Sequence, residues 1–160
     1  METLKFKLNK GFMAVEVLVA TSIILASILV AMAVTEKAIS FSRQSFHISQ
    51  ASFLLEEGAE IVRIARDNSW DDVSSLNVST DYYPVFTDGV WSFSLISSKI
   101  GIFDRKINIS NVKRNASTSD ISTTGTNDVG TKLVTVTVSW TEGGRMISKN
   151  LSFYVMDIFS

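Results

Sequence analysis

The sequence contains no cysteine, one proline and one histidine among its 160 residues. Without cysteine, the protein has no disulfide bonds, no thiol catalysis and no zinc site built on thiolates. A single histidine also argues against a histidine-based metal site. We therefore expect neither a metal ion nor another cofactor.

The chain also lacks an excess of charge of either sign. Its 15 basic and 16 acidic residues give a net charge of −1, so nothing indicates a nucleic-acid partner. The length predicts one domain with a core that needs no metal or disulfide. Mean hydropathy is nevertheless +0.23 with 19% charged residues, which indicates that apolar residues are concentrated in one segment.

That segment is Phe12–Val34, an apolar run of 23 residues behind a basic leader at residues 1–11. As a helix it is about 34 Å long, enough to cross a hydrocarbon core of about 30 Å. The leader carries three lysines against one glutamate, so it should stay cytoplasmic while the rest of the chain crosses. The run is too long for a secretory signal. We therefore expect a single-pass protein of the inner or cytoplasmic membrane, in contact with lipid, with its C-terminal part extracytoplasmic.

Glu16 is the one charged residue in this run. A carboxylate at the centre of a membrane helix costs about 2.5–3.5 kcal/mol even on insertion scales, so its presence needs a reason. Glu16 either lies close enough to the interface to reach water, or it pairs with a positive charge at the same depth. The run alone leaves both readings open.

The segment Lys10-Gly11-Phe12-Met13-Ala14-Val15-Glu16 resembles the class III signal of type IV prepilins and pseudopilins. In that family a membrane peptidase cuts after the glycine and methylates the new N-terminal phenylalanine. The resemblance implies cleavage between Gly11 and Phe12, N-methylation of Phe12, and an assembly role for Glu16. Its carboxylate would neutralise the new ammonium on its own chain or on a neighbour. The sequence departs from the family in having Met13 where Thr or Ser is commoner, and in having no proline within the apolar helix.

The helix is predicted to continue to Asn68, because no proline precedes Pro84 and Gly58 is the only glycine between Phe12 and Gly89. Residues 35–68 form its amphipathic continuation. One apolar stripe has three- and four-residue spacings, with Ser45 and Ser52 filling its gaps; it comprises Val34, Ala38, Phe41, Ile48, Leu55, Ala59 and Val62. A second stripe has intervals of seven and comprises Ile39, Phe46 and Phe53. The two stripes indicate either a helix covered on two sides or one wide core-facing surface.

The end of this predicted helix carries an acidic cluster. The segment Phe53–Arg63 contains an E-E-G-x-E-x-x-R run that resembles small minor pilins of the PilV-like kind. Glu60 lies three positions before Arg63, a spacing typical of ion pairs on a solvated helix face, and Glu56 and Glu57 precede it on the same helix. With no nucleophile or histidine ligand nearby, we do not expect catalysis or metal binding there.

Residues 69–160 are predicted to form a β-rich headgroup of four antiparallel strands. The predicted strands are Val90–Ile96, Phe103–Val112, Leu133–Trp140 and Ile147–Met156. Thr141–Arg145 has the composition of a hairpin turn, and Arg105 lies outside the apolar pattern of its strand. The polar run 116–130 is expected to be an exposed loop, either an inert connector or a contact surface. The fold class is then α+β, a long N-terminal α-helix packed on a four-stranded antiparallel sheet with one wet face.

These observations favour a structural role over an enzyme. His47 lies mid-helix and there is no G-x-S-x-G motif, so no serine triad is indicated. The resemblance implies a minor pilin or pseudopilin of a cell-surface or periplasmic filament. Its partners would be a prepilin peptidase/methyltransferase, other pilin subunits and a pilus assembly platform. The alternative from another class is an uncleaved, membrane-anchored extracytoplasmic binding or adhesion module.

Overall fold

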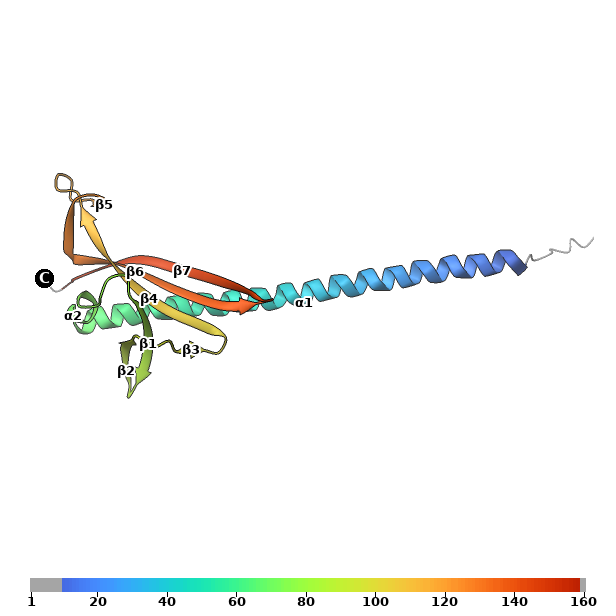
Figure 1. The fold of residues 1–160 in the computed structure, drawn as a ribbon, viewed down its shortest axis with the longest axis horizontal. Helices are drawn as coiled ribbons and strands as arrows, with labels where there is room; N and C mark the ends of the chain where they lie inside the picture. Colours follow the sequence, from blue (N-terminus) through green and yellow to red (C-terminus); the bar gives the residue numbers. More distant parts are fainter. Residues whose placement is uncertain (1–9, 159–160) are drawn as a thin grey trace, which may run out of the picture. The chain divides into compact units, whose positions relative to one another are not determined.

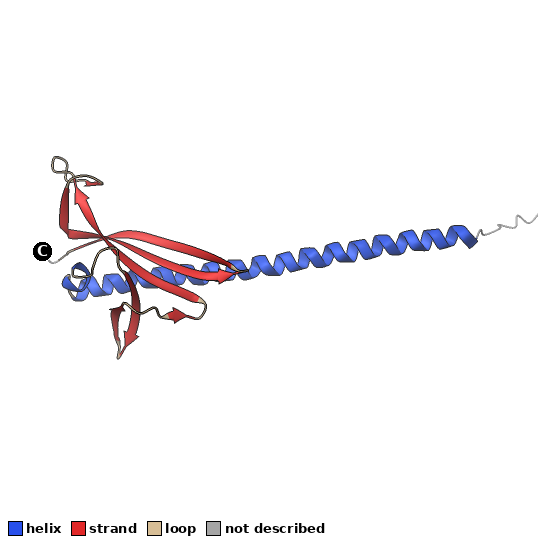
Figure 2. Ribbon diagram, in the orientation of Figure 1, coloured by secondary structure: helices blue, strands red, loops and turns tan. Residues whose placement is uncertain are grey.

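The computed structural model describes residues 10–158, and the side-chain surroundings of residues 13–158. The elements in chain order are α1 (Lys10–Asn68), α2 (Asp71–Ser74), β1 (Asp81–Thr87), β2 (Val90–Ser94), β3 (Lys99–Ile100), β4 (Phe103–Arg114), β5 (Ile121–Ser122), β6 (Thr126–Glu142) and β7 (Arg145–Met156) (Figures 1 and 2). The fold is α+β with a long N-terminal helix, as predicted. Most of the leader predicted at residues 1–11 lies outside the described residues.

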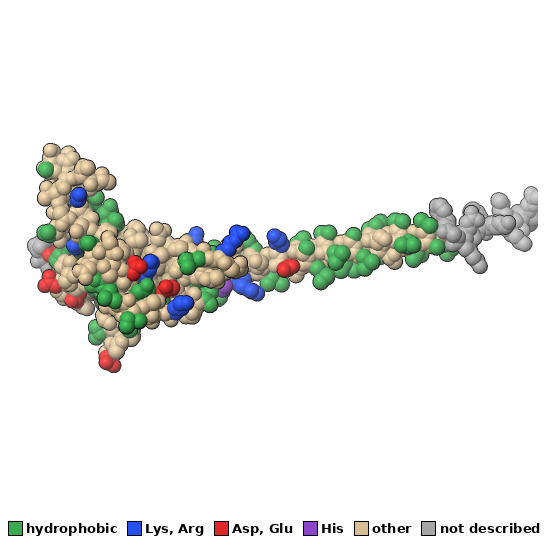
Figure 3. Space-filling model, viewed as in Figure 1, with side chains coloured by type: hydrophobic (Ala, Val, Ile, Leu, Met, Phe, Trp, Pro, Cys, Tyr) green, Lys and Arg blue, Asp and Glu red, His purple; other side chains and the backbone are tan. Residues whose placement is uncertain are grey.

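The chain divides into two compact units, residues 1–45 and 46–160. The described part of the first unit is entirely helical, and every residue from 13 to 45 is exposed. Figure 3 shows apolar side chains covering much of this stretch. Hydroxyl groups within it bond back to the preceding turn: Thr21 Oγ1 donates to the Val17 carbonyl oxygen at 2.9 Å, and Ser27 Oγ to that of Ile23 at 2.8 Å. These bonds leave few polar atoms unsatisfied, as a lipid environment requires.

The second unit contains the C-terminal end of α1 and an antiparallel sheet. The strand order is β2-β1-β4-β6-β7, with β3 and β5 each paired to β4. The predicted number of four strands is wrong, because the sheet has seven. The four predicted segments are present as β2, β4, β6 and β7, and the prediction missed β1, β3 and β5.

Local features of the sequence explain why these three strands were not predicted. β3 and β5 have two residues each, too short to show alternation. β1 contains Pro84, which usually argues against a strand. Only Asp81 and Tyr82 of β1 pair with β4, so Pro84 lies where the strand has a single neighbour and a missing N–H is tolerated. The polar run 116–130 contains β5, and β6 already begins at Thr126.

The core lies between α1 and one face of β4 and β6. Alternate residues of these strands are buried, including Ile107, Val134 and Val136 at 0% exposure. They pack with Leu55 and Val62 of α1 in one cluster. The opposite face of β6 carries the hydroxyl residues Thr135, Thr137 and Ser139, which are partly exposed. The sequence predicts this arrangement, in which one face of the sheet packs on the helix and the other face is polar.

The β6–β7 hairpin also forms where it was predicted. Glu142 pairs with Arg145, and the two residues between them, Gly143 and Gly144, have φ values of 57° and 76°. Two consecutive positive φ values are those of a type I′ turn, which glycine adopts without steric cost. This turn fixes the register of the longest strand pair in the sheet.

Candidate functional site

The residues of the predicted processing signal lie in the first turns of α1. Gly11 and Phe12 are within the helix, and their side chains lie outside those that the structure describes. Glu16 is exposed, and no hydrogen bond or ion pair joins it to another of residues 13–158. In an α-helix Glu16 is about one turn from the backbone nitrogen of Phe12. An ammonium created at Phe12 would therefore lie beside this carboxylate.

The glutamate-rich turn of α1 lies close against the sheet at Gly58. A Cβ atom placed on Gly58 would lie 2.6 Å from Cγ1 of Val136 and 3.4 Å from Cδ of Arg105. The first distance is far inside van der Waals contact, so the helix can lie this close to β6 only because residue 58 has no side chain.

Arg105 is the main correction to the sequence reading of β4. It is not out of pattern: it occupies an inward-facing position between Phe103 and Ile107 and is 2% exposed. Its Nη1 donates to Oε2 of Glu57 and, at 3.5 Å, to the Leu54 carbonyl oxygen. The guanidinium carbon lies 5.8 Å from the centre of the Trp91 ring. The arginine therefore joins sheet and helix by a partly buried ion pair, whose loss on one side only would leave a buried charge.

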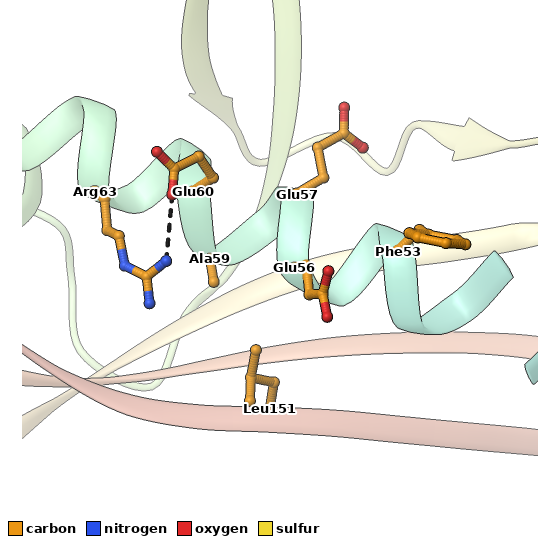
Figure 4. Close-up of a pocket in the computed structure, with 7 residues that line it drawn as sticks. All are labelled: Phe53, Glu56, Glu57, Ala59, Glu60, Arg63 and Leu151. Atoms are coloured by element: carbon orange, nitrogen blue, oxygen red, sulfur yellow. Dashed lines mark hydrogen bonds and ion pairs between the residues drawn. The ribbon is translucent and has the colours of Figure 1, made fainter. Parts of the chain in front are cut away.

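The rest of the acidic cluster is solvated, as predicted. Glu60 pairs with Arg63 at 3.2 Å, and both side chains are at least half exposed. An open groove of about 480 Å³ lies between this turn and β7, with Leu151 pointing from β7 toward the helix (Figure 4). No described group of three or more His, Cys, Asp or Glu residues is placed to hold a metal ion. The exposed ion pair of Glu60 with Arg63 contributes little stability.

His47, the one histidine, has a packing role. Its Nδ1 lies 3.3 Å from Oε1 of Glu142 in the β6–β7 hairpin, and its ring meets the ring of Phe103 edge-on at 6.2 Å. Trp140 Nε1 donates to the other oxygen of Glu142 at 3.2 Å. His47 thus joins the helix to the end of the hairpin.

A second polar cluster holds the far ends of β4 and β6 together. Arg114 Nε donates to Oδ2 of Asp128 at 2.6 Å, and the backbone N–H of Gly130 donates to Oδ1 at 2.9 Å. Hydrogen bonds from Thr131 and Arg114 hold the pKa of Asp128 below its ordinary value of 3.8. On the neighbouring strand pair, a hydrogen bond to Asp81 raises the pKa of Lys106.

The two apolar stripes of the helix have different surroundings. Leu55 and Val62 of the first stripe are buried against the sheet, whereas Ser45 and Ser52, predicted to fill its gaps, are exposed. Phe46 and Phe53 of the second stripe are 61% and 71% exposed. The reading of one wide core-facing surface is therefore wrong for residues 46–68.

Sequence reasoning missed two of the contacts that join helix and sheet, the ion pair of Arg105 with Glu57 and the close approach of Gly58 to Val136. The available signals were an arginine in an otherwise apolar row of a strand and a glycine inside a long helix next to a glutamate.

Comparison of the chain with models of protein families, with curated proteins and with solved structures finds no match.

Proposed function

We propose that this protein is a structural subunit, a minor pilin or pseudopilin, of a type IV pilus-like filament. The observation that carries the proposal is the segment Lys10–Glu16, where a basic leader ends in Gly11, Phe12 follows the cut, and Glu16 is the fifth residue after it. In support, α1 is long and apolar enough to cross a membrane by length and composition. A sheet domain with its own core follows.

The physical logic links cleavage to assembly. A cut after Gly11 removes the cytoplasmic lysines and creates an ammonium on Phe12, which the peptidase then methylates. Glu16 compensates this charge in an environment without water, on its own chain or on a neighbouring subunit. Moving the helix from lipid into a bundle of similar helices changes little apolar exposure, so other subunits and an assembly platform can drive the transfer. The proposal includes no catalytic step and no cofactor.

The test is mass analysis of the protein coexpressed with a prepilin peptidase, and of the same protein without the enzyme. We expect the enzyme to yield a chain that begins at Phe12 and is one methyl group heavier than the unmodified product. Gly11→Val should remain uncut, because the side chain blocks the position before the scissile bond.

Ala14→Val is the matched control, since it adds the same side chain three residues beyond the cut and should be processed normally. An intact Met1 chain, under a peptidase that cuts a control prepilin, would contradict the proposal. That result would favour the uncleaved anchored binding or adhesion module.

A further inference from the structure

The sheet has a short free edge at β2, which pairs with β1 and with no other described strand (Figure 1). The turn Asp88-Gly89 has φ values of 53° and 83°, those of a type I′ turn, so Thr87 and Val90 form the hydrogen-bonded pair that closes the hairpin. Bonded and non-bonded pairs alternate along an antiparallel ladder. The N–H and C=O groups of Trp91 and Phe93 therefore point away from β1, and no hydrogen bond from another described residue reaches them.

This edge lacks the charges that commonly keep an edge strand from pairing with another chain. β2 has the sequence Val-Trp-Ser-Phe-Ser, without a charged residue, whereas the other edge strand, β7, contains Arg145 and Lys149. An uncharged edge with unpaired backbone groups is a template for an added strand.

A cleft of about 300 Å³ lies along this edge, and four consecutive residues of β2, 90–93, line it. The other lining residues come from the ends of α1 and α2. They are the apolar Ile64, Ala65 and Leu76 and the polar Asn68, Asp72 and Ser75. This volume is at the lower end for ligand pockets, so the cleft suits one or two side chains of an extended chain rather than a large molecule. A strand added to β2 would direct side chains into it.

The rim of the cleft is acidic. Asp72 lines it and Asp71 precedes Asp72, and both are exposed, with no hydrogen bond or ion pair from either carboxylate to another described residue. Arg66, at the same end of α1, is already paired with Asp67 at 2.7 Å. The charge therefore favours a positively charged partner.

The acidic rim also disfavours a second copy of this chain as the occupant. Two β2 edges side by side would bring two acidic rims together, and like charges across an interface are unfavourable. Arg105, whose guanidinium lies beside the Trp91 ring, does not offset this charge, because it is 2% exposed and paired with Glu57.

We propose that the β2 edge binds an extended segment of another protein, apolar at its centre and flanked by lysine or arginine, as an added strand. The backbone of the segment pairs with Trp91 and Phe93, an apolar side chain enters the cleft beside Leu76, and the basic side chains lie near Asp71 and Asp72. The site lies wholly within the 46–160 unit and does not depend on the cut after Gly11.

The first test is fluorescence anisotropy of labelled peptides titrated with the full-length chain in micelles of a neutral detergent. The peptide Lys-Lys-Val-Thr-Val-Lys-Lys should bind at least tenfold more tightly than its matched control, Glu-Glu-Val-Thr-Val-Glu-Glu. The difference should shrink in about 1 M salt, where charges are screened beyond about 3 Å. Equal affinity for the two peptides, or binding of neither, would overturn the proposal.

Two further peptides test the backbone pairing without changing the protein. One is the basic peptide N-methylated at both valines, and the other is N-methylated at the threonine and the lysine that follows it. Alternate N–H groups of a strand point to opposite sides, so only one of the two should lose binding at least tenfold. Equal affinity of the two methylated peptides would show that no strand is added.

A protein variant locates the site. Asp72→Lys should weaken binding of the basic peptide at least threefold, whereas Asp120→Lys, the same charge change on an exposed residue between β4 and β5, should not. Equal weakening by both variants would show attraction by overall charge and would contradict a site at β2. Light scattering that finds two copies which the basic peptide does not separate would assign the edge to a second copy instead. Failure of processing appears only in the N-terminal mass and leaves these results unaffected.

Discussion

Two single residues set how helix and sheet meet in the 46–160 unit. Gly58 lets α1 approach Val136, and Arg105 extends from β4 to Glu57 on the same turn of the helix. The absence of a side chain at Gly58 lets the helix come close to β6, and the ion pair holds this turn of the helix opposite Arg105. An ion pair with one buried partner adds little net stability over a well-packed apolar pair, so its main effect is to fix the position of the helix along the sheet.

Replacement of Gly58 by alanine should reveal this close approach. Helix propensity alone would make Gly58→Ala stabilising by about 1 kcal/mol. The added Cβ would however lie 2.6 Å from Cγ1 of the fully buried Val136, and overpacking of this kind costs about 1–3 kcal/mol. We expect the overlap to win and the free energy of unfolding to fall by about 1 kcal/mol, measured by urea denaturation.

The matched background for this variant is Val136→Ala, which removes Cγ1. In that background Gly58→Ala should cost nothing or stabilise the protein, because the overlap is gone while the propensity gain remains. Identical effects of Gly58→Ala in both backgrounds would show that the contact with Val136 does not set the cost.

At the scale of elements, the sheet has one long edge, formed by the 12 residues of β7. Its helix-facing positions follow their partners on β6: Leu151 lies opposite Val136, and Lys149 lies opposite the buried Val138. An inward-facing lysine on an edge strand disfavours the addition of a further strand, because its charge would be buried there. The edge is thereby protected although most of its side chains are exposed.

The β4–β6 ladder has its own electrostatic support in Asp128. Since the pKa of this carboxyl is lowered on folding, the unfolded chain binds more protons around pH 3.8, and stability is lost as the pH falls through the folded-state pKa. Asp128→Asn should therefore lower the free energy of unfolding by about 1 kcal/mol at pH 7, and the difference from the wild type should vanish at acid pH.

Denaturation at a series of pH values from 7 to 2 measures this difference. Asp120→Asn is the control, an exposed carboxylate eight residues before Asp128 whose side chain makes no hydrogen bond to the described residues. A loss of stability in Asp128→Asn that is the same at every pH would contradict an electrostatic origin.

For the whole molecule, the features set by local pattern were predictable. The extent of α1 follows from the absence of proline, and the β6–β7 hairpin follows from two glycines between alternating runs. Features set by distant partners were not. Arg105 is buried because Glu57 lies 48 positions earlier in the chain, and no periodicity within β4 reports that. The second apolar stripe, of Ile39, Phe46 and Phe53, was visible in the sequence, but the exposure of Phe46 and Phe53 depends on which stripe the sheet covers.

Whether the whole chain acts as a filament subunit turns on the pairing of Glu16. In a filament core the ammonium of a cleaved Phe12 has no water to solvate it, and an unpaired buried charge costs several kcal/mol. We therefore expect Glu16→Ala to be cleaved like the wild type, because cleavage occurs before the N-terminus is buried. The amount of this variant in purified filaments should fall at least tenfold, because a loss of about 1.4 kcal/mol of pairing energy corresponds to a factor of ten.

Quantitative immunoblots of sheared filaments against membrane pools measure this incorporation. Glu36→Ala removes a carboxylate from the same helix beyond the apolar segment, where water remains, and should be incorporated normally. Glu16→Gln separates charge from size, since the amide keeps the shape and a hydrogen-bond acceptor but cannot neutralise the ammonium. If Glu16→Gln is incorporated as well as the wild type, neutralisation of the N-terminus is not what Glu16 does. Loss with both Glu16 variants and not with Glu36→Ala would assign the effect to charge pairing inside the assembled core.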